Sequence, residues 1–395
     1  MNIVSIFRRS TNSKYFLPEI DGLRFFAIIT VMIYHMNTSY VRHLGYSYAE
    51  WKELVGVGSF SEPGWWLIRM DIGVKVFFAI SGFILALPFL KQYMYNGNKV
   101  ILKDYFYRRL TRLEPPFVIT LIIFSLVHIV MLHEDVREIL PHFLSGLIYG
   151  HVFIFGESNP VNPVTWSLET EAQFYIILPF IMILLFKIRN AVLKIIFILL
   201  LLALSIYAKG YFLTHHVTHL ESSILAFFTN FAMGIFFAVF FLRHGSQFFQ
   251  KKNLLYDLLG IISVFVMFYF YKPQAVWYNN VLLNLSVLGL FFSVFKGTVS
   301  NWFYTRPVIY IIGGMCYSLY LLHYAFFYLI VKYTGNFKTH INYWTDLGLQ
   351  VLLMLPLFLI VGSVFYLFIE KPCMDKNWPQ NLYTFIKSKI LNRKS

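Results

Sequence analysis

Ten long apolar stretches constrain the fold of this 395-residue chain more than any other feature. A helix of about 20 apolar residues crosses a bilayer, and 13% charged residues, against about 25% in soluble domains, are too few for a soluble surface. We therefore expect an all-α, polytopic membrane bundle of about ten transmembrane helices, and we exclude a soluble enzyme, a disordered chain and an outer-membrane barrel. The predicted spans are residues 20–39, 72–90, 115–132, 173–188, 191–208, 222–242, 254–271, 277–296, 308–331 and 347–369.

Residues 143–156 form a further apolar stretch that is short for a full crossing. Because it contains Gly146 and Gly150, we expect a re-entrant or interfacial segment there. Residues 1–372 are predicted to form one membrane domain, and the Lys-rich residues 373–395 a basic cytoplasmic tail on the anionic leaflet.

The distribution of Lys and Arg predicts the orientation of the bundle. With a cytoplasmic N-terminus, 23 of the 33 basic residues fall in inside segments and 8 in outside segments. Cytoplasmic loops carry such an excess, so we expect both termini in the cytoplasm. The net charge of +14 then reflects orientation rather than nucleic-acid binding. Membrane lipids are the expected neighbours, and the oligomeric state is left open.

The first span contains Asp21, Arg24 and His35, although ionisable groups are costly in a membrane and usually face the bundle interior. At about 100° per residue the three side chains share one helix face, over roughly 20 Å of rise. One interpretation is an ion pair between Asp21 and Arg24 with a core histidine above it. The other is a site in which His35 is a general base, a role that suits histidine near neutral pH.

Basic residues also gather before the third span. Arg108 and Arg112 are one helical turn apart, beside Arg109, and Pro115 and Pro116 are predicted to end the helix at the membrane boundary. Two guanidinium groups on one face suit a polyanion such as the phosphates of coenzyme A. The alternative is an ordinary positively charged cytoplasmic loop.

The fourth span begins with aromatic and acidic residues. The helix dipole alone explains Glu169 near a helix N-terminus. Glu171 is followed by apolar residues and is expected at the depth of His35, where a carboxylate and a histidine would activate and hold a hydroxyl group. Trp166 and Tyr175 suit stacking on a sugar ring, although both residue types are also usual at membrane interfaces.

The second span offers a weaker candidate. Ser81 has no nucleophile-elbow context, so we interpret Ser81 and Gly82 as residues that allow close helix packing. Lys75 follows Asp71 by four residues and is expected to pair with it.

Metal and disulfide chemistry find little support. His215, His216 and His219 have a spacing that suits a metal, but no matching carboxylate or cysteine set accompanies them, so we predict no metal site. Cys316 and Cys373 give no disulfide framework, and we interpret both as structural.

Six stretches together resemble the acyltransferase 3 family of integral membrane acyltransferases, which modify sugars and other cell-surface molecules. They occur in order nearly from end to end, each at its expected span. They are EIDGLR at 19–24 with His35, GVKVFFAISGF at 73–83, RRLTRLEP at 108–115, TWSL at 165–168 with Glu171, Phe174 and Tyr175, YSLYLLH at 317–323, and FIEKP at 368–372.

The resemblance implies a bacterial inner-membrane enzyme that transfers an acyl group, usually acetyl from acetyl-CoA, to a carbohydrate hydroxyl. Acetyl-CoA and the carbohydrate are its expected partners, with no permanently bound cofactor. By this resemblance His35 is the catalytic histidine and Glu171 supports it, with Asp21 as a further catalytic candidate. Arg24, Arg108, Arg109 and Arg112 serve donor binding or site architecture. The candidates on the acceptor side are Trp166, Glu169, Tyr175 and His323.

The chain departs from the family pattern in three places. Many members have adjacent glutamates where Glu171 is here followed by Ala172, so the role of a second carboxylate is unfilled or taken by Glu169. Lys75 stands where many members have an acidic or neutral residue. The frequent C-terminal hydrolase-like extension is absent, which predicts the membrane core alone. A transporter or flippase for a lipid-linked sugar, and a protein that relays acyl groups to a separate transferase, remain alternatives.

Overall fold

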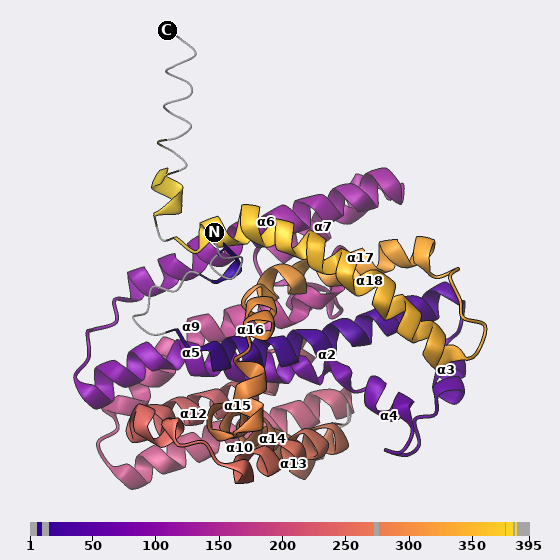
Figure 1. Ribbon diagram of the computed structural model, residues 1–395. Helices are drawn as coiled ribbons and strands as arrows, with labels where there is room; N and C mark the ends of the chain where they lie inside the picture. Colours follow the sequence, from indigo (N-terminus) through magenta and orange to yellow (C-terminus); the bar gives the residue numbers. More distant parts are fainter. Residues whose placement is uncertain (1–5, 10–15, 272–275, 376, 382–383, 385–395) are drawn as a thin grey trace.

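The computed structural model describes residues 6–9, 16–271, 276–375, 377–381 and 384, and this part of the chain is helical without strands (Figure 1). The longer helices are α2 (Pro18–His43), α5 (Gly73–Tyr95), α6 (Leu102–Met131), α7 (Val136–Leu147), α9 (Trp166–Lys187), α10 (Ala191–His215), α12 (Ile224–Gln250), α13 (Leu254–Phe270), α14 (Trp277–Lys296), α17 (Cys316–Thr334) and α18 (Tyr343–Phe365). The short ones are α3 (Tyr48–Val55), α4 (Pro63–Leu67), η1 (Met70–Ile72), α8 (His151–Phe155), η2 (Pro163–Thr165), α11 (Thr218–Glu221), α15 (Val299–Tyr304), α16 (Pro307–Gly314), the π-helical η3 (Tyr366–Glu370) and α19 (Lys371–Cys373).

Every predicted span coincides with a helix, the ninth with the pair α16 and α17. In the described residues, seven helices are long and apolar enough to cross a membrane, or eight if α16 and α17, bent by 71°, count as one span. Two of the ten predicted spans are not among these eight. The first, α13, has only 17 residues, and the second, α2, has 26 residues but carries Asp21, Arg24 and His35 among its apolar residues. Ten crossings, with both termini in the cytoplasm, therefore stay a prediction.

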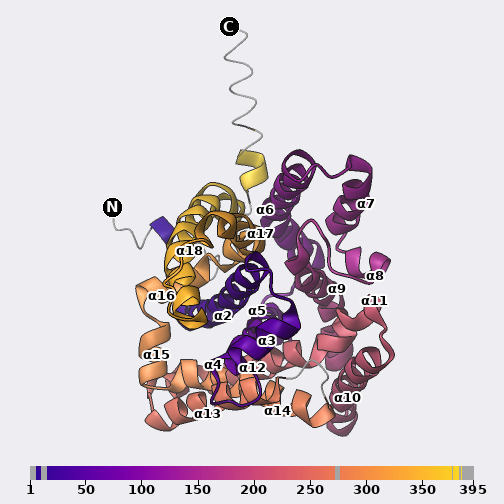
Figure 2. The ribbon, with the colours of Figure 1, turned by 90° about the vertical axis from the view of Figure 1, so that its right-hand side faces the viewer.

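The polar helix α2 is the centre of the bundle. It packs against α5, α16, α17 and α18, and its charged residues Asp21 and Arg24 are buried. Figure 2 shows α2 and α5 surrounded by α16 to α18, by α6, α7 and α9, and by α10 and α12 to α14. Because neighbouring helices cover α2, its ionisable side chains face protein rather than lipid, as such residues usually do.

Two glycines allow α5 and α12 to pack closely. A Cβ atom at Gly82 would collide with the backbone carbonyl of Phe231, and one at Gly234 would collide with the carbonyl of Ala79. Small residues permit such close approach between membrane helices. The packing role predicted for Gly82 is thus confirmed.

We expect Gly234→Ala to lower the free energy of unfolding of the protein in detergent by about 1–3 kcal/mol, the usual cost of overpacking a core. Its melting temperature should fall accordingly. Gly210→Ala in α10 is the matched control, because a Cβ atom there meets nothing within 4 Å. Alanine is favoured over glycine within a helix by about 1 kcal/mol, so this control should keep or raise the melting temperature. Equal shifts for the two variants would contradict the packing argument.

Helix α6 continues through Pro115 and Pro116, so the prediction that this proline pair ends a helix is wrong. A proline within a helix leaves the carbonyl four residues earlier without its usual partner. For Pro115 this is the carbonyl of Thr111, which accepts a hydrogen bond of 2.7 Å from the indole N–H of Trp378. A side chain far along the sequence therefore compensates for the proline.

The apolar stretch 143–156 falls on α7 and α8, which have 12 and 5 residues and are each too short to cross a bilayer. Its predicted re-entrant or interfacial position stays a prediction. So does the position of the basic tail, because residues 376, 382–383 and 385–395 lie outside the described residues.

Candidate active site

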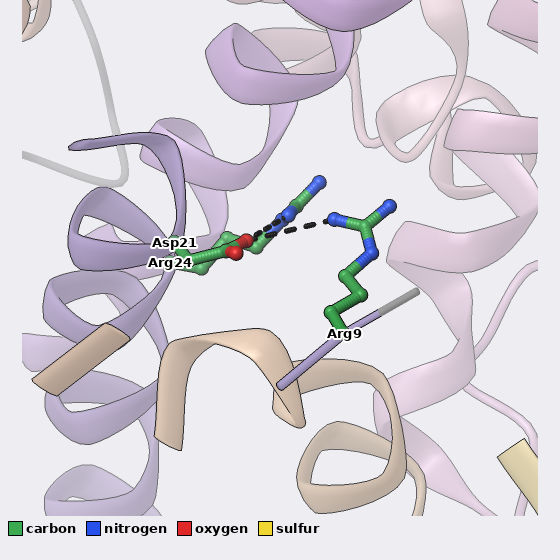
Figure 3. A network of polar contacts seen from close by, with 3 residues as sticks. All are labelled: Arg9, Asp21 and Arg24. Atoms are coloured by element: carbon green, nitrogen blue, oxygen red, sulfur yellow. Dashed lines mark hydrogen bonds and ion pairs between the residues drawn. The ribbon is translucent and has the colours of Figure 1, made fainter. Parts of the chain in front are cut away.

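Asp21 lies between two arginines at the start of α2 (Figure 3). Its Oδ1 accepts a hydrogen bond from Arg24, one turn along the helix, and is 3.5 Å from Nη1 of Arg9. The ion pair predicted between Asp21 and Arg24 is confirmed. A buried ion pair needs further polar partners to offset its desolvation, and Arg9 supplies one. In the sequence, Arg9 is only one of the 23 basic residues that we assigned to the cytoplasmic side.

A cavity of about 110 Å³ adjoins this group, and Arg9, Arg24, Arg109 and Arg112 line it. Arg109 and Arg112 are three residues apart on α6, so their side chains share a face. Arg108 is exposed and does not line the cavity. The residue beside Arg112 in the cavity is therefore Arg109, rather than Arg108 as the helical spacing had indicated.

Two carboxylates from distant helices also line the cavity. Glu171 in α9 accepts a hydrogen bond from the hydroxyl of Ser81 in α5. Glu370 in η3 accepts hydrogen bonds through Oε2 from the backbone N–H and the hydroxyl of Ser318, at 2.9 and 2.5 Å. Its Oε1 has no hydrogen-bond partner among the described residues. The cavity therefore contains both signs of charge, and arginine predominates.

Ser81 lines this cavity, so it has a polar contact in addition to the packing role that we expected. Its hydroxyl donates to Glu171 and lines the cavity together with Tyr175, which lies one turn after Glu171. The sequence carried no signal for the contact, since Ser81 and Glu171 are 90 residues apart. Glu370 was visible only as a carboxylate in the motif FIEKP, at the end of an apolar stretch.

His35 contacts a second histidine. The ring centroids of His35 in α2 and His323 in α17 are 5.0 Å apart, and Tyr324 packs edge-on against His35 at 5.3 Å. The Nδ1 of His323 is 2.7 Å from the carbonyl oxygen of Tyr320. Since a carbonyl only accepts, Nδ1 carries the proton and Nε2 is left as an acceptor, without a partner in the described part of the chain.

Tyr320 connects the histidine pair with the cavity. Its side chain lines the cavity and is 2.7 Å from the hydroxyl of Ser167, while its backbone carbonyl orients His323. Glu171 and His35 were expected to converge at one depth, and this stays a prediction. Glu171 lines the cavity with the arginines, and no hydrogen bond or ion pair joins it to His35 in the described structure.

Comparison with known proteins identifies the family of the chain. The model of the family described as "Acyltransferase domain" matches residues 17–369. The chain is an acyltransferase 3 family member. "Putative O-acetyltransferase SACOL0978" of Staphylococcus aureus strain COL is 25% identical over 99% of this chain and 63% of its own length. "O-acetyltransferase OatA" of strain NCTC 8325 is 24% identical over 93% of this chain and 58% of its own length. No solved structure matches.

This acyltransferase 3 chain therefore spans less than two thirds of the length of the relatives it matches. Within the chain, the match extends over the whole helical bundle from α2 to η3. The histidine pair and most of the residues that line the cavity lie inside residues 17–369, while Arg9 and Glu370 lie outside them.

Two acceptor-side candidates have structural partners. Glu169 is buried, and its Oε2 accepts a hydrogen bond of 3.0 Å from the backbone N–H of Val152. It thus caps the short helix α8 rather than its own helix. Trp166 packs against Phe78 and Phe227, with ring centroids 6.3 and 5.6 Å apart.

The remaining predicted residues have simple surroundings. His215 and His219 contact the backbone carbonyls of Tyr211 and Phe153, at 2.9 and 2.8 Å. Cys316, interpreted as structural, lines the arginine-rich cavity at the start of α17.

Proposed function

We propose that this chain transfers an acyl group, most simply the acetyl group of acetyl-CoA, to a hydroxyl of a cell-surface polysaccharide or lipid-linked glycan such as O-antigen or exopolysaccharide. Membership of the acyltransferase 3 family and the names of the relatives support O-acyl transfer. The observation that carries the proposal is the arginine-lined cavity, which Tyr320 connects to the pair of His35 and His323.

The arginines suit an anionic donor. Four guanidinium groups line the cavity against the carboxylates of Glu171 and Glu370, while Asp21 is already paired. Guanidinium forks bind phosphate with two parallel hydrogen bonds, and such charge-assisted bonds are strong where water is scarce. We propose that Arg109 and Arg112 bind the phosphates of coenzyme A. Asp21 holds the side chain of Arg24 in place.

His35 is the proposed general base. It takes the proton of the acceptor hydroxyl, whose oxygen forms a bond to the thioester carbonyl carbon. The carbon–sulfur bond breaks, and the coenzyme A thiolate leaves with a proton returned by the histidine. His35 is half-buried, whereas His323 is fully buried, so His35 has the access to substrate and His323 positions its ring.

The two substrates approach from opposite membrane faces in this proposal. Arg24 and His35 are 11 residues apart on α2, which corresponds to roughly 16 Å of rise. If the N-terminus lies on the cytoplasmic side of a bacterial inner membrane, the arginines face the donor and His35 lies toward the acceptor. The extended pantetheine arm would bridge that distance within the bundle.

Labelled acetyl-CoA supplied to inverted membrane vesicles tests the proposal. We expect label to reach carbohydrate only when this chain is present, and to raise the glycan mass by one acetyl unit. Label that remains on the protein would favour an acyl relay. Glycan that crosses the membrane without label would favour a transporter, and either result would overturn the proposed activity.

Ser81→Ala should lower the rate of acetyl transfer by about tenfold, because Glu171 loses a hydrogen bond. Such a hydrogen bond contributes about 1 kcal/mol or more. Initial rates in the vesicle assay measure the effect. Ser363→Ala is the control, since Ser363 lies outside the cavity and its hydroxyl forms a long hydrogen bond, of 3.7 Å, to the sulfur of Met315. Equal rates for wild type and Ser81→Ala would remove Ser81 from the site.

A further inference from the structure

A second group of charges, in which Lys75 is buried and the other members are half-buried, lies apart from the arginine-lined cavity. It contains Lys75 in the first turn of α5, Lys209 near the end of α10, Asp71 in η1 and Tyr271 directly after α13. The two lysines lie over the ring of Phe227 in the first turn of α12, Lys75 also lies over the ring of Tyr271, and Tyr271 contacts Asp71. The group thus lies at one end of the bundle, where two helices begin and two end.

The two lysines share one aromatic ring. The Nζ atoms of Lys75 and Lys209 are 4.2 and 4.7 Å from the centroid of Phe227. Lys75 is only 5% exposed, and its ammonium group has no hydrogen bond or ion pair with any residue that the structure describes. The pair expected between Lys75 and Asp71 is therefore not formed. Asp71 instead accepts a hydrogen bond of 2.5 Å from the hydroxyl of Tyr271.

This arrangement leaves a local excess of positive charge. Two ammonium groups face one carboxylate, and Oδ1 of that carboxylate, on Asp71, has no partner among the described residues. Burying an ammonium group without a counter-ion is costly, and cation–π contacts offset only part of that cost. The N-terminus of α5, at Gly73, adds a partial positive charge at the same place. An anion bound between the lysines would remove the imbalance.

The lysines also adjoin the proposed active site. Phe78, one turn after Lys75, lines the arginine-rich cavity and packs against Phe227 at 5.3 Å. The same end of the bundle carries aromatic rings suited to sugars: Trp166 lies 5.4 Å from Nζ of Lys75, and Trp65 packs against Tyr269 at 6.2 Å. A ligand held here would bring an adjoining group toward the cavity.

We propose that Lys75 and Lys209 bind an anionic group, a carboxylate or a phosphate, of the glycan that accepts the acyl group. This inference rests on the proposed function, in which a glycan is the acceptor. It also gives a role to Lys75, which is buried without a counter-ion among the described residues. The lysines then select charged over neutral acceptors.

Saturation-transfer NMR on the full chain in nanodiscs tests the proposal, with methyl glucuronide, glucose 1-phosphate and the neutral methyl glucoside as probes. We expect one or both anionic sugars to bind at least tenfold more tightly than the neutral one. A preference for glucuronide identifies a uronic acid, and a preference for the phosphate identifies a phosphorylated sugar. Lys75→Met and Lys209→Met should each remove the preference, and Lys75→Arg should keep it.

The control is Lys332→Met, which removes an exposed lysine that contacts Tyr328 in α17, and it should bind all three sugars as wild type does. Wild-type protein that does not distinguish charged from neutral sugars would overturn the proposal. So would a folded Lys209→Met variant that keeps the preference. The vesicle assay tests acyl transfer separately. Sugar binding that depends on the lysines, without acyl transfer, would overturn only the proposed function. Acyl transfer with sugar binding that does not depend on the lysines would overturn only this inference.

Discussion

His35→Ala is expected to lower acetyl transfer from acetyl-CoA to glycan by about 10²- to 10⁴-fold, the usual contribution of a general base. Its ring is half-buried beside His323, and His323 is fixed through Nδ1 by the carbonyl of Tyr320. Without the imidazole, the acceptor hydroxyl has no base in contact with it. Initial rates in inverted vesicles measure the effect, at equal amounts of membrane-inserted protein.

The control is His128→Ala, because His128 pairs with Glu134 near the end of α6 and lies outside the site. It should retain wild-type transfer. His323→Ala should have a smaller effect than His35→Ala, since it removes a positioning contact and leaves the base. A His35→Ala variant that inserts normally and acylates its glycan at the wild-type rate would refute the assignment.

Arg112→Ala is expected to raise the KM for acetyl-CoA by about 10- to 100-fold with a smaller change in kcat. Arg112 lines the cavity with Arg109, and charge-assisted hydrogen bonds to phosphate contribute about 1.5–3 kcal/mol each. The dependence of the initial rate on acetyl-CoA concentration separates KM from kcat.

Arg108→Ala is the matched control, since Arg108 comes from the same helix and the same cluster of charges but is exposed outside the cavity. Its KM for acetyl-CoA should stay within about twofold of wild type, the size expected for an exposed charge. If Arg108→Ala and Arg112→Ala raised the KM equally, the donor would bind the exposed surface of α6 rather than the cavity.

The two groups of polar residues lie at opposite ends of α2. Asp21 and Arg24 lie at one end of this helix with the arginine-lined cavity, and His35 lies near the other with His323. Because α2 is central and covered by its neighbours, both groups face the interior. This geometry suits a donor and an acceptor that enter from different faces and meet inside the bundle.

Much of this protein was predictable from local sequence. The lengths of the apolar stretches predicted a helix at every span, and the spacing of Asp21 and Arg24 predicted their ion pair. These features depend on helix geometry and on the cost of charge in a membrane, and both act over a few residues.

The composition of the site was decided only by the tertiary structure. Hydrogen bonds from Ser81 to Glu171 and from Ser318 to Glu370 join residues 90 and 52 positions apart. The carbonyl freed by Pro115 finds the indole of Trp378, and Lys75 lies over Phe227 rather than beside Asp71. Helix periodicity predicts which face of a helix a side chain occupies. The hydrogen-bond partner of a buried polar group, however, depends on which side chains the packing of the helices places next to it. That choice depends on how the helices assemble, which no local pattern records.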